Sequence, residues 1–141
     1  MLKNLSVATS EHVGYYKLLK QSCAKHDIEF IPLGLGQKWS GFQMKYTLWE
    51  KYINTLPDNE IIMINDAYDV VILDKAEIII QKFKKFNKPI VFSIQKGAII
   101  DMSFPKCYDQ VMCSGNIIGY VKQIKQLIKV ILKHKNTWKD I

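Results

Sequence analysis

The sequence contains no arginine, so all 20 of its basic residues are lysines. A lysine neutralises phosphate as a point charge, but it cannot make the planar two-pronged contact that reads guanine. The formal net charge of +7 therefore favours the binding of phosphate groups over base-specific recognition of nucleic acid. A composition biased towards lysine and isoleucine is the alternative source of this charge.

Cysteine is scarce, with three residues, and no Cys-x-x-Cys or His-x-x-x-His spacing occurs. This excludes a disulfide framework and a zinc knuckle. We expect Cys23 to be buried in a helix, and Cys107 and Cys113 to be free thiols.

The chain has no uncharged apolar run of about 18 residues, so we expect no membrane span. The segment Met1–Val7 is too short for the apolar region of a secretory leader, and polar residues follow it at 9–11. The cytoplasm is therefore the default compartment. Repeats, linkers and low-complexity segments are also missing. The 141 residues, 48% of them hydrophobic, are thus expected to form one domain, 1–141.

Apolar runs and helical patterns alternate along the chain. Strands are predicted at 5–8, 28–33, 61–64, 89–94 and within 111–120, and helices at 15–24, 42–56, 75–86 and 121–134. The segment 95–108 is predicted to be a loop. The helix at 42–56 is expected to turn Met44, Leu48, Tyr52 and Ile53 inwards. This alternation predicts an α/β fold with an open, mostly parallel, Rossmann-like sheet and helices on both faces.

Open sheets of this kind bind ligands at the carboxyl ends of their strands, here at 9–10, 34–41 and 65–69. Asp66 and Asp69 follow the most hydrophobic strand directly. Two neighbouring carboxylates repel each other unless a cation lies between them, and oxygen ligands suit Mg²⁺ or Mn²⁺. The alternative is that Asp66 caps a turn and Asp69 is solvated.

Three further side chains belong to these loops or adjoin them. Tyr68 and the loop residue Trp39 are candidates for stacking on a base or sugar, or else for ordinary packing. Lys45 opens the helix after the Trp39 loop and is a candidate phosphate ligand, although a solvated lysine is the commoner outcome. No Gly-x-Gly-x-x-Gly or Walker-type phosphate loop is present.

Six short segments follow one another at a characteristic spacing. They are Leu5–Thr9, Leu33–Gly36 with Trp39, Gly41 with Lys45, Asp66–Val71, Val91–Ser93 and Ser114–Tyr120. In this order they resemble the glycosyltransferase domain of the procollagen lysyl hydroxylases and the related procollagen glycosyltransferases. The similarity extends over nearly the whole chain.

The resemblance implies a GT-A-type fold that binds a UDP-sugar, UDP-glucose or UDP-galactose, through Mn²⁺ (or Mg²⁺). Asp66 and Asp69 match the metal-binding aspartates of the family. It further implies transfer of the sugar to hydroxylysine, or to galactosyl-hydroxylysine, of a collagen-like acceptor. A nucleic-acid-binding module, suggested only by the charge, gives Asp66 and Asp69 no role, so no nucleic-acid partner is expected.

The same resemblance assigns the nucleotide contacts. Thr9, Trp39 and Tyr68 match positions that hold the uridine and ribose, and Lys45 matches a lysine near the nucleotide.

The donor-sugar end of the pocket is matched by Ser114, Gly115 and Asn116, where the family has Ser-Gly-Gly. Two more departures accompany this one. The segment 39–45 is shorter than in the family, and Gln95 stands where the family has an acidic residue.

The family also continues with an acidic run and, further on, with a histidine that completes the metal shell. Trp138–Ile141 stands where that run would begin. We therefore expect a domain truncated at its C-terminal end that lacks the third metal ligand. The alternative to an active transferase is a catalytically inactive or incomplete nucleotide-sugar-binding domain.

Overall fold

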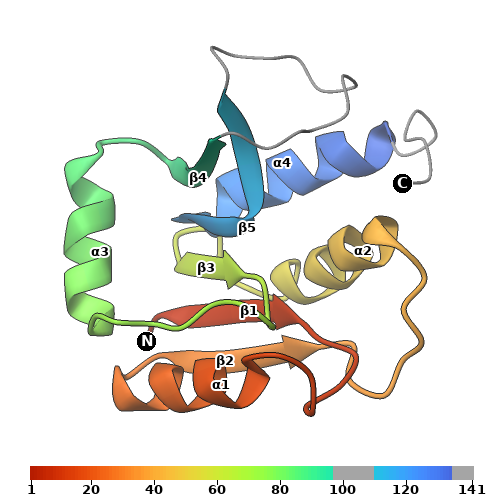
Figure 1. Cartoon of the computed structure of the whole chain (residues 1–141). Coiled ribbons are helices and arrows are strands. Elements are labelled where there is room, and N and C mark those ends of the chain that lie inside the picture. The colour runs from red at the N-terminus through yellow and green to blue at the C-terminus, as the bar shows by residue number, and fades with distance from the viewer. Residues whose placement is uncertain (97–109, 135–141) are drawn as a thin grey trace.

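The computed structural model describes residues 1–96 and 110–134, in which strands and helices alternate as the sequence predicts (Figure 1). The elements are β1 (Lys3–Val7), α1 (Tyr16–Lys25), β2 (Glu29–Leu33), α2 (Phe42–Ile53), β3 (Ile61–Asn65), α3 (Ala76–Lys85), β4 (Ile90–Lys96), β5 (Gln110–Tyr120) and α4 (Val121–Lys133). Most of the loop predicted at 95–108, including Cys107, lies outside the described residues.

The strands form one sheet in the order β2-β1-β3-β5-β4. β1 pairs in parallel with β2 and β3, whereas β5 is antiparallel to both β3 and β4. Four strands therefore run in one direction, which confirms the predicted mostly parallel sheet. The reversal of β5 was not predicted, because a buried strand reads the same in either direction.

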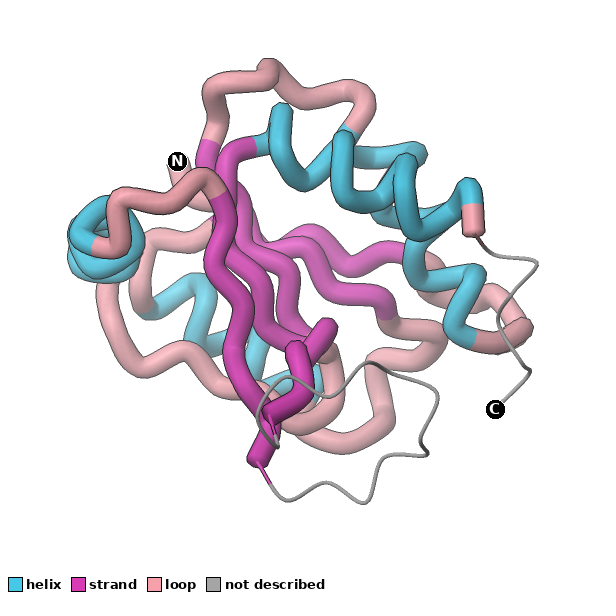
Figure 2. Tube along the Cα trace, turned by 90° about the horizontal axis from the view of Figure 1, so that it is seen from above, coloured by secondary structure: helices cyan, strands magenta, loops and turns pink. Residues whose placement is uncertain are grey.

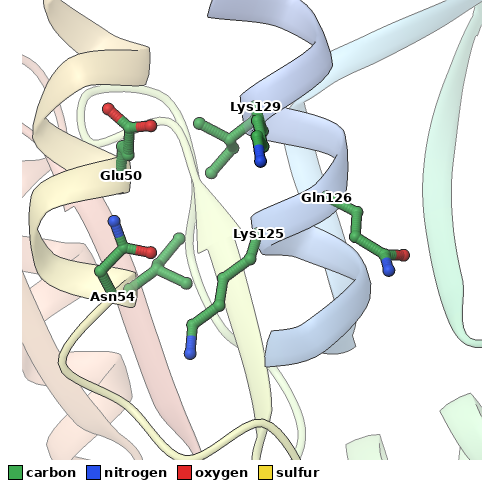
Figure 3. Close-up of a pocket in the computed structure, with 7 residues that line it drawn as sticks. Glu50, Asn54, Lys125, Gln126 and Lys129 are labelled. Carbon is green, nitrogen blue, oxygen red and sulfur yellow. The ribbon is translucent and has the colours of Figure 1, made fainter.

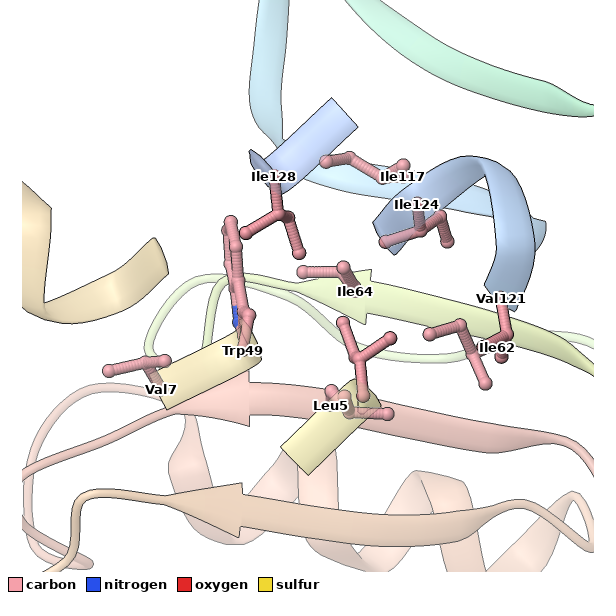
Figure 4. Packing of buried hydrophobic residues seen from close by; sticks show 10 residues of the cluster. Leu5, Val7, Trp49, Ile62, Ile64, Ile117, Val121, Ile124 and Ile128 are labelled. Carbon is pink, nitrogen blue, oxygen red and sulfur yellow. The ribbon is translucent and has the colours of Figure 1, made fainter. Parts of the chain in front are cut away.

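The pleat of the central strands divides the core between the two faces of the sheet, and Figure 2 shows the strands lying between the helices. Leu5 and Ile64 are fully buried on the face that α2 and α4 cover (Figure 4). Met63 points to the opposite face, where Leu19 of α1 and residues of α3 pack. The prediction of helices on both faces is thus confirmed. Among the described residues, none of the helices is both long and apolar enough to cross a bilayer.

The buried side of α2 differs from the one predicted. Of the four expected inner residues only Ile53 is fully buried, while Met44, Leu48 and Tyr52 are half-buried. The centre of the buried stripe is Lys45, Trp49 and Ile53. Leu48 and Tyr52 nevertheless pack against the core, so the prediction was right in part, but it left out Lys45 and Trp49.

Cys23 is completely buried, as predicted, and its Sγ accepts a hydrogen bond from Asn4 Nδ2 at 3.4 Å. Burial raises the pKa of the Cys23 thiol, and it likewise raises the pKa of the Tyr16 hydroxyl. A hydrogen bond to Glu60 raises the pKa of the Lys3 ammonium. In the folded chain these three groups therefore hold their protons more tightly than they do after unfolding.

We predict that the free energy of unfolding falls as the pH rises above about 9. Each of these three groups has a raised folded-state pKa, so its contribution is complete below its unfolded pKa and is lost as the pH passes its folded pKa. The ordinary pKa values, from which folding raises these groups, are 9.0 for the Cys23 thiol, 10.0 for the Tyr16 hydroxyl and 10.5 for the Lys3 ammonium. Urea unfolding at about pH 8 and pH 10 measures the effect. A higher midpoint at the alkaline pH would contradict the prediction.

Candidate functional site

A cleft of about 410 Å³ opens where the carboxyl ends of β1 and β3 lie side by side. The residues that line it are Val7, Thr9, Trp39, Lys45, Asp66, Ala67, Tyr68 and Asp69. They come from the last residue of β1, from the loops after β1, β2 and β3, and from the first turn of α2. All six side chains that the sequence suggested for metal and nucleotide binding therefore face one cleft, at the edge of the sheet where ligands are expected.

A second cavity, of about 360 Å³, lies between α2 and α4 (Figure 3). It is lined by Glu50, Asn54 and Lys125, among others, and contains none of the predicted site residues. The Lys125 ammonium donates hydrogen bonds to the Leu56 carbonyl at 2.9 Å and to Asp58 Oδ1 at 2.7 Å. The Lys125 ammonium is thus already paired with the loop that follows α2, so the cleft after β3 is the better candidate.

Asp66 is positioned by β5. Its backbone N–H donates to the carbonyl of Gly115 at 2.9 Å. A Cβ atom at position 115 would stand 2.2 Å from Asp66 Oδ2, so only glycine lets the β5 backbone lie this close to the carboxylate. On its other side, Asp66 Oδ1 forms an ion pair with Lys45 Nζ.

Lys45 is not the solvated lysine that its residue type suggests. It is 8% exposed, and its Nζ lies 5.3 Å from the centre of the Trp49 ring. The aromatic face and the Asp66 carboxylate together stabilise a buried ammonium group. The four-residue spacing of Lys45, Trp49 and Ile53 was the signal in the sequence that could have located this lysine on the buried face.

Tyr68 joins two loops of the site. Its hydroxyl accepts hydrogen bonds from the backbone N–H groups of Thr9 at 2.9 Å and Ser10 at 3.1 Å. Its own carbonyl accepts from the N–H of Tyr15 at 2.8 Å, beside Gly14, where a Cβ would stand 2.4 Å from that carbonyl oxygen. Burial opposes ionisation of the Tyr68 hydroxyl, but the donors at Thr9 and Ser10 lower its pKa. This role in positioning Thr9 was not predicted.

We predict that Tyr68→Phe lowers the free energy of unfolding by about 1–2 kcal/mol, because two partly buried backbone N–H groups lose their acceptor. Tyr15→Phe is the matched control, since Tyr15 is 53% exposed, and it should change stability by less than about 0.5 kcal/mol. Urea unfolding measures both variants. Equal stability of the two would refute the role of the Tyr68 hydroxyl.

Trp39 and Phe42 form an edge-to-face pair, with ring centres 6.0 Å apart. Trp39 is 47% exposed and Phe42 is 56% exposed. Trp39 therefore presents an accessible aromatic surface to the cleft that it lines, as a stacking residue requires. Phe42 supports that ring, although the sequence suggested it only as the start of a helix.

The predicted donor-sugar segment, 114–116, lies in β5 between β3 and β4. β3 pairs with β5 in a regular register up to Asn116, whereas β4 changes its register with β5 at this segment. β4 pairs Phe92 with Ile117 but Ser93 with Cys113, so 114–116 bulges out of that ladder. The bulge brings Gly115 against the Asp66 carboxylate.

Asn116 pairs with Asn65 at the end of β3, and its Oδ1 accepts from Asn65 Nδ2 at 2.6 Å. Neither Gly115 nor Asn116 is among the residues that line the cleft. Gly115 adjoins Asp66, which does line it, and the Asn116 side-chain carbonyl accepts its hydrogen bond from Asn65. The side chain of Ser114 lies outside the described parts. The assignment of Ser114, Gly115 and Asn116 to a donor sugar stays a prediction.

Asp66 and Asp69 fit a divalent cation that arrives with a phosphate ligand. Within residues 1–96 and 110–134, no group of three or more histidine, cysteine or acidic side chains is arranged to hold a metal ion. Two carboxylates on one cleft nevertheless suit Mg²⁺ or Mn²⁺, which commonly takes one or two carboxylates and completes its shell with water and phosphate oxygens. Two carboxylates are therefore enough to hold a divalent cation only if the diphosphate also contributes oxygen ligands.

Comparison with known proteins agrees with this architecture. The chain is 33% identical over 143 residues to a procollagen-lysine,2-oxoglutarate 5-dioxygenase of Drosophila melanogaster, covering 90% of this chain and 20% of that protein. It is 28% identical over 143 residues to a multifunctional procollagen lysine hydroxylase and glycosyltransferase of Rattus norvegicus, covering 89% and 19%. The chain thus spans about a fifth of the length of these relatives.

The fold is similar to the crystal structure of a glycosyltransferase involved in the glycosylation of the major capsid of PBCV-1. The TM-score is 0.52 at 14% identity, covering 96% of this chain and 67% of that one. The family model described as the PLOD GT domain matches residues 1–140. The chain therefore belongs to the PLOD GT domain family and is a glycosyltransferase-like domain.

Proposed function

We propose that the cleft binds a UDP-sugar together with Mn²⁺ or Mg²⁺ and that the chain transfers glucose or galactose from it. The acceptor proposed is hydroxylysine, or galactosyl-hydroxylysine, of a collagen-like protein. One observation carries the proposal: two carboxylates, a buried lysine and a half-exposed tryptophan line the same cleft at the carboxyl edge of the sheet. The collagen-modifying relatives support the choice of acceptor.

In this proposal, different residues of the cleft bind different parts of the donor. The exposed Trp39 ring provides a surface for the uracil or ribose, and Thr9 and Tyr68 line the same part of the cleft. Lys45 supplies positive charge for the diphosphate. Asp66 and Asp69 hold the divalent cation.

The transfer step needs stabilisation of the negative charge that develops on the leaving UDP. When bound, the metal supplies Lewis-acid neutralisation of that diphosphate. Lys45 adds a second positive charge from the first turn of α2, where its Nζ lies 5.3 Å from the centre of the Trp49 ring.

The binding half of the proposal is tested by thermal unfolding with Mn²⁺ and UDP. A ligand at about 100 times its Kd stabilises the folded state by about 2.7 kcal/mol. We expect UDP, UDP-glucose or UDP-galactose to raise the Tm when Mn²⁺ is present. Absence of a shift with all three, in a folded sample, would overturn the proposal.

A domain that binds the donor without transferring the sugar is the second candidate. It is favoured by the pairing of Asp66 with Lys45, which occupies one of the two carboxylates that line the cleft. This candidate predicts UDP binding but no release of sugar to water and no transfer to a hydroxylysine peptide. Turnover of UDP-glucose or UDP-galactose that requires Asp69 would exclude it.

A further inference from the structure

The pair of Lys45 and Asp66 differs from the other ion pairs of the described residues. The Lys45 side chain is 10% exposed, compared with 17% for Lys3 and 63% for Lys82 in their own pairs. A charge that is removed from water to this degree is costly unless an opposite charge stays within reach. Lys45 therefore needs an anion at all times, and Asp66 is the one it contacts.

Asp66 is confined in turn. Its Oδ1 is engaged by Lys45, and its Oδ2 lies against the backbone of Gly115. Asp69, on the same cleft, is exposed and forms no ion pair with the described residues. The two carboxylates are thus inequivalent, because one is already neutralised by a cation of the protein and the other is not.

We infer that Lys45 is an internal counter-ion for Asp66, and that a nucleoside diphosphate must draw it away before a divalent cation binds Asp66 fully. This inference rests on the proposed function. The phosphates supply the anion that Lys45 needs, and the metal supplies the cation that Asp66 then needs. Exchange of the two partners makes metal and diphosphate bind cooperatively, and the coupling is reciprocal.

The first test measures binding of Mn²⁺ alone, without any sugar transfer, by the electron paramagnetic resonance signal of free Mn²⁺. Lys45→Met keeps the apolar stem over Trp49 but removes the competing charge. It should bind Mn²⁺ alone about tenfold more tightly than the unmodified chain, since a charged hydrogen bond no longer has to break. The increase in Mn²⁺ affinity caused by UDP should shrink in this variant. Lys51→Met, at an exposed position of the same helix, is the control and should leave both quantities unchanged.

The second test measures UDP binding without metal by calorimetry. Asp66→Asn removes the partner of Lys45 and so frees its ammonium to bind the phosphates. Asp69→Asn also removes one negative charge from the cleft, but it leaves the pair of Lys45 and Asp66 intact. We expect Asp66→Asn to bind metal-free UDP several-fold more tightly than Asp69→Asn does. Equal affinities in the two variants would overturn the inference.

The outcomes separate this inference from the proposed function. If the unmodified chain binds UDP with Mn²⁺ but Lys45→Met gains no affinity for Mn²⁺ alone, the exchange is refuted and the proposed function stands. If neither chain binds Mn²⁺ or UDP under any condition, both are refuted. Urea unfolding of each variant verifies that it is folded before these comparisons are made.

Discussion

Replacing Asp69 with alanine should abolish the stabilisation of the chain by UDP and Mn²⁺. Loss of a group that merely orients a metal ligand commonly weakens metal binding 10- to 100-fold, so loss of a ligand should cost at least about 100-fold. Asp69 is the better target of the two carboxylates because it is exposed and forms no ion pair with the part of the chain that the structure describes. Asp66→Ala, in contrast, would also leave the buried Lys45 without its anion.

The measurement is the Tm shift with Mn²⁺ and UDP, and, where transfer occurs, the rate of sugar transfer to a hydroxylysine peptide. Asp74→Ala is the matched control, since Asp74 is also accessible and its pair with Lys82 lies on the surface, outside the cleft. Without ligand, both variants should unfold like the unmodified chain. A ligand-induced shift that survives in Asp69→Ala would show that this carboxylate does not hold the metal.

The arrangement of the sheet was predictable from sequence to the extent that it depends on local pattern. The run at 61–64 gave β3, because a strand covered on both faces is continuously apolar, and the segment 5–8 gave β1 although the buried Ser6 interrupts its apolar residues. The direction of β5 was not predictable in this way, because direction follows from how the chain returns to the sheet. Its bulge at 114–116 also depends on a neighbour, since β4 changes register at Phe92 and Ser93.

The candidate site divides in the same manner. Asp66, Asp69 and Trp39 were found because polar and aromatic side chains after strands collect at the carboxyl edge of a parallel sheet. The pairing of Lys45 with Asp66 could not be derived, since it joins residues 21 positions apart from different elements. The bonds from Thr9 and Ser10 to the Tyr68 hydroxyl likewise exist only once β1 and β3 are side by side. The types and positions of residues in the sequence were thus enough to indicate the candidate site, whereas the ion pair within it depends on contacts that form only in the folded chain.

Trp49→Ala should be among the most destabilising single substitutions in the chain, with a loss of about 3–5 kcal/mol in the free energy of unfolding. Trp49 is 1% exposed and packs in the cluster that contains Leu5, Val7 and Ile128 (Figure 4). Truncation leaves a cavity between α2 and the sheet, and it also removes the aromatic face beneath the Lys45 ammonium. The same substitution therefore weakens the core and disorganises the charge pair of the cleft.

Trp39→Ala provides the matched comparison, because it removes an indole that is 47% exposed. It should change stability by less than about 0.5 kcal/mol and yet weaken UDP binding, since its ring lines the cleft. Urea unfolding and UDP titration of both variants measure the two effects separately. We expect Trp49→Ala to lower mainly the free energy of unfolding and Trp39→Ala to lower mainly the affinity for UDP. A large loss of stability in Trp39→Ala, with unchanged UDP affinity, would instead make the loop tryptophan a packing residue and leave the nucleotide without its aromatic contact.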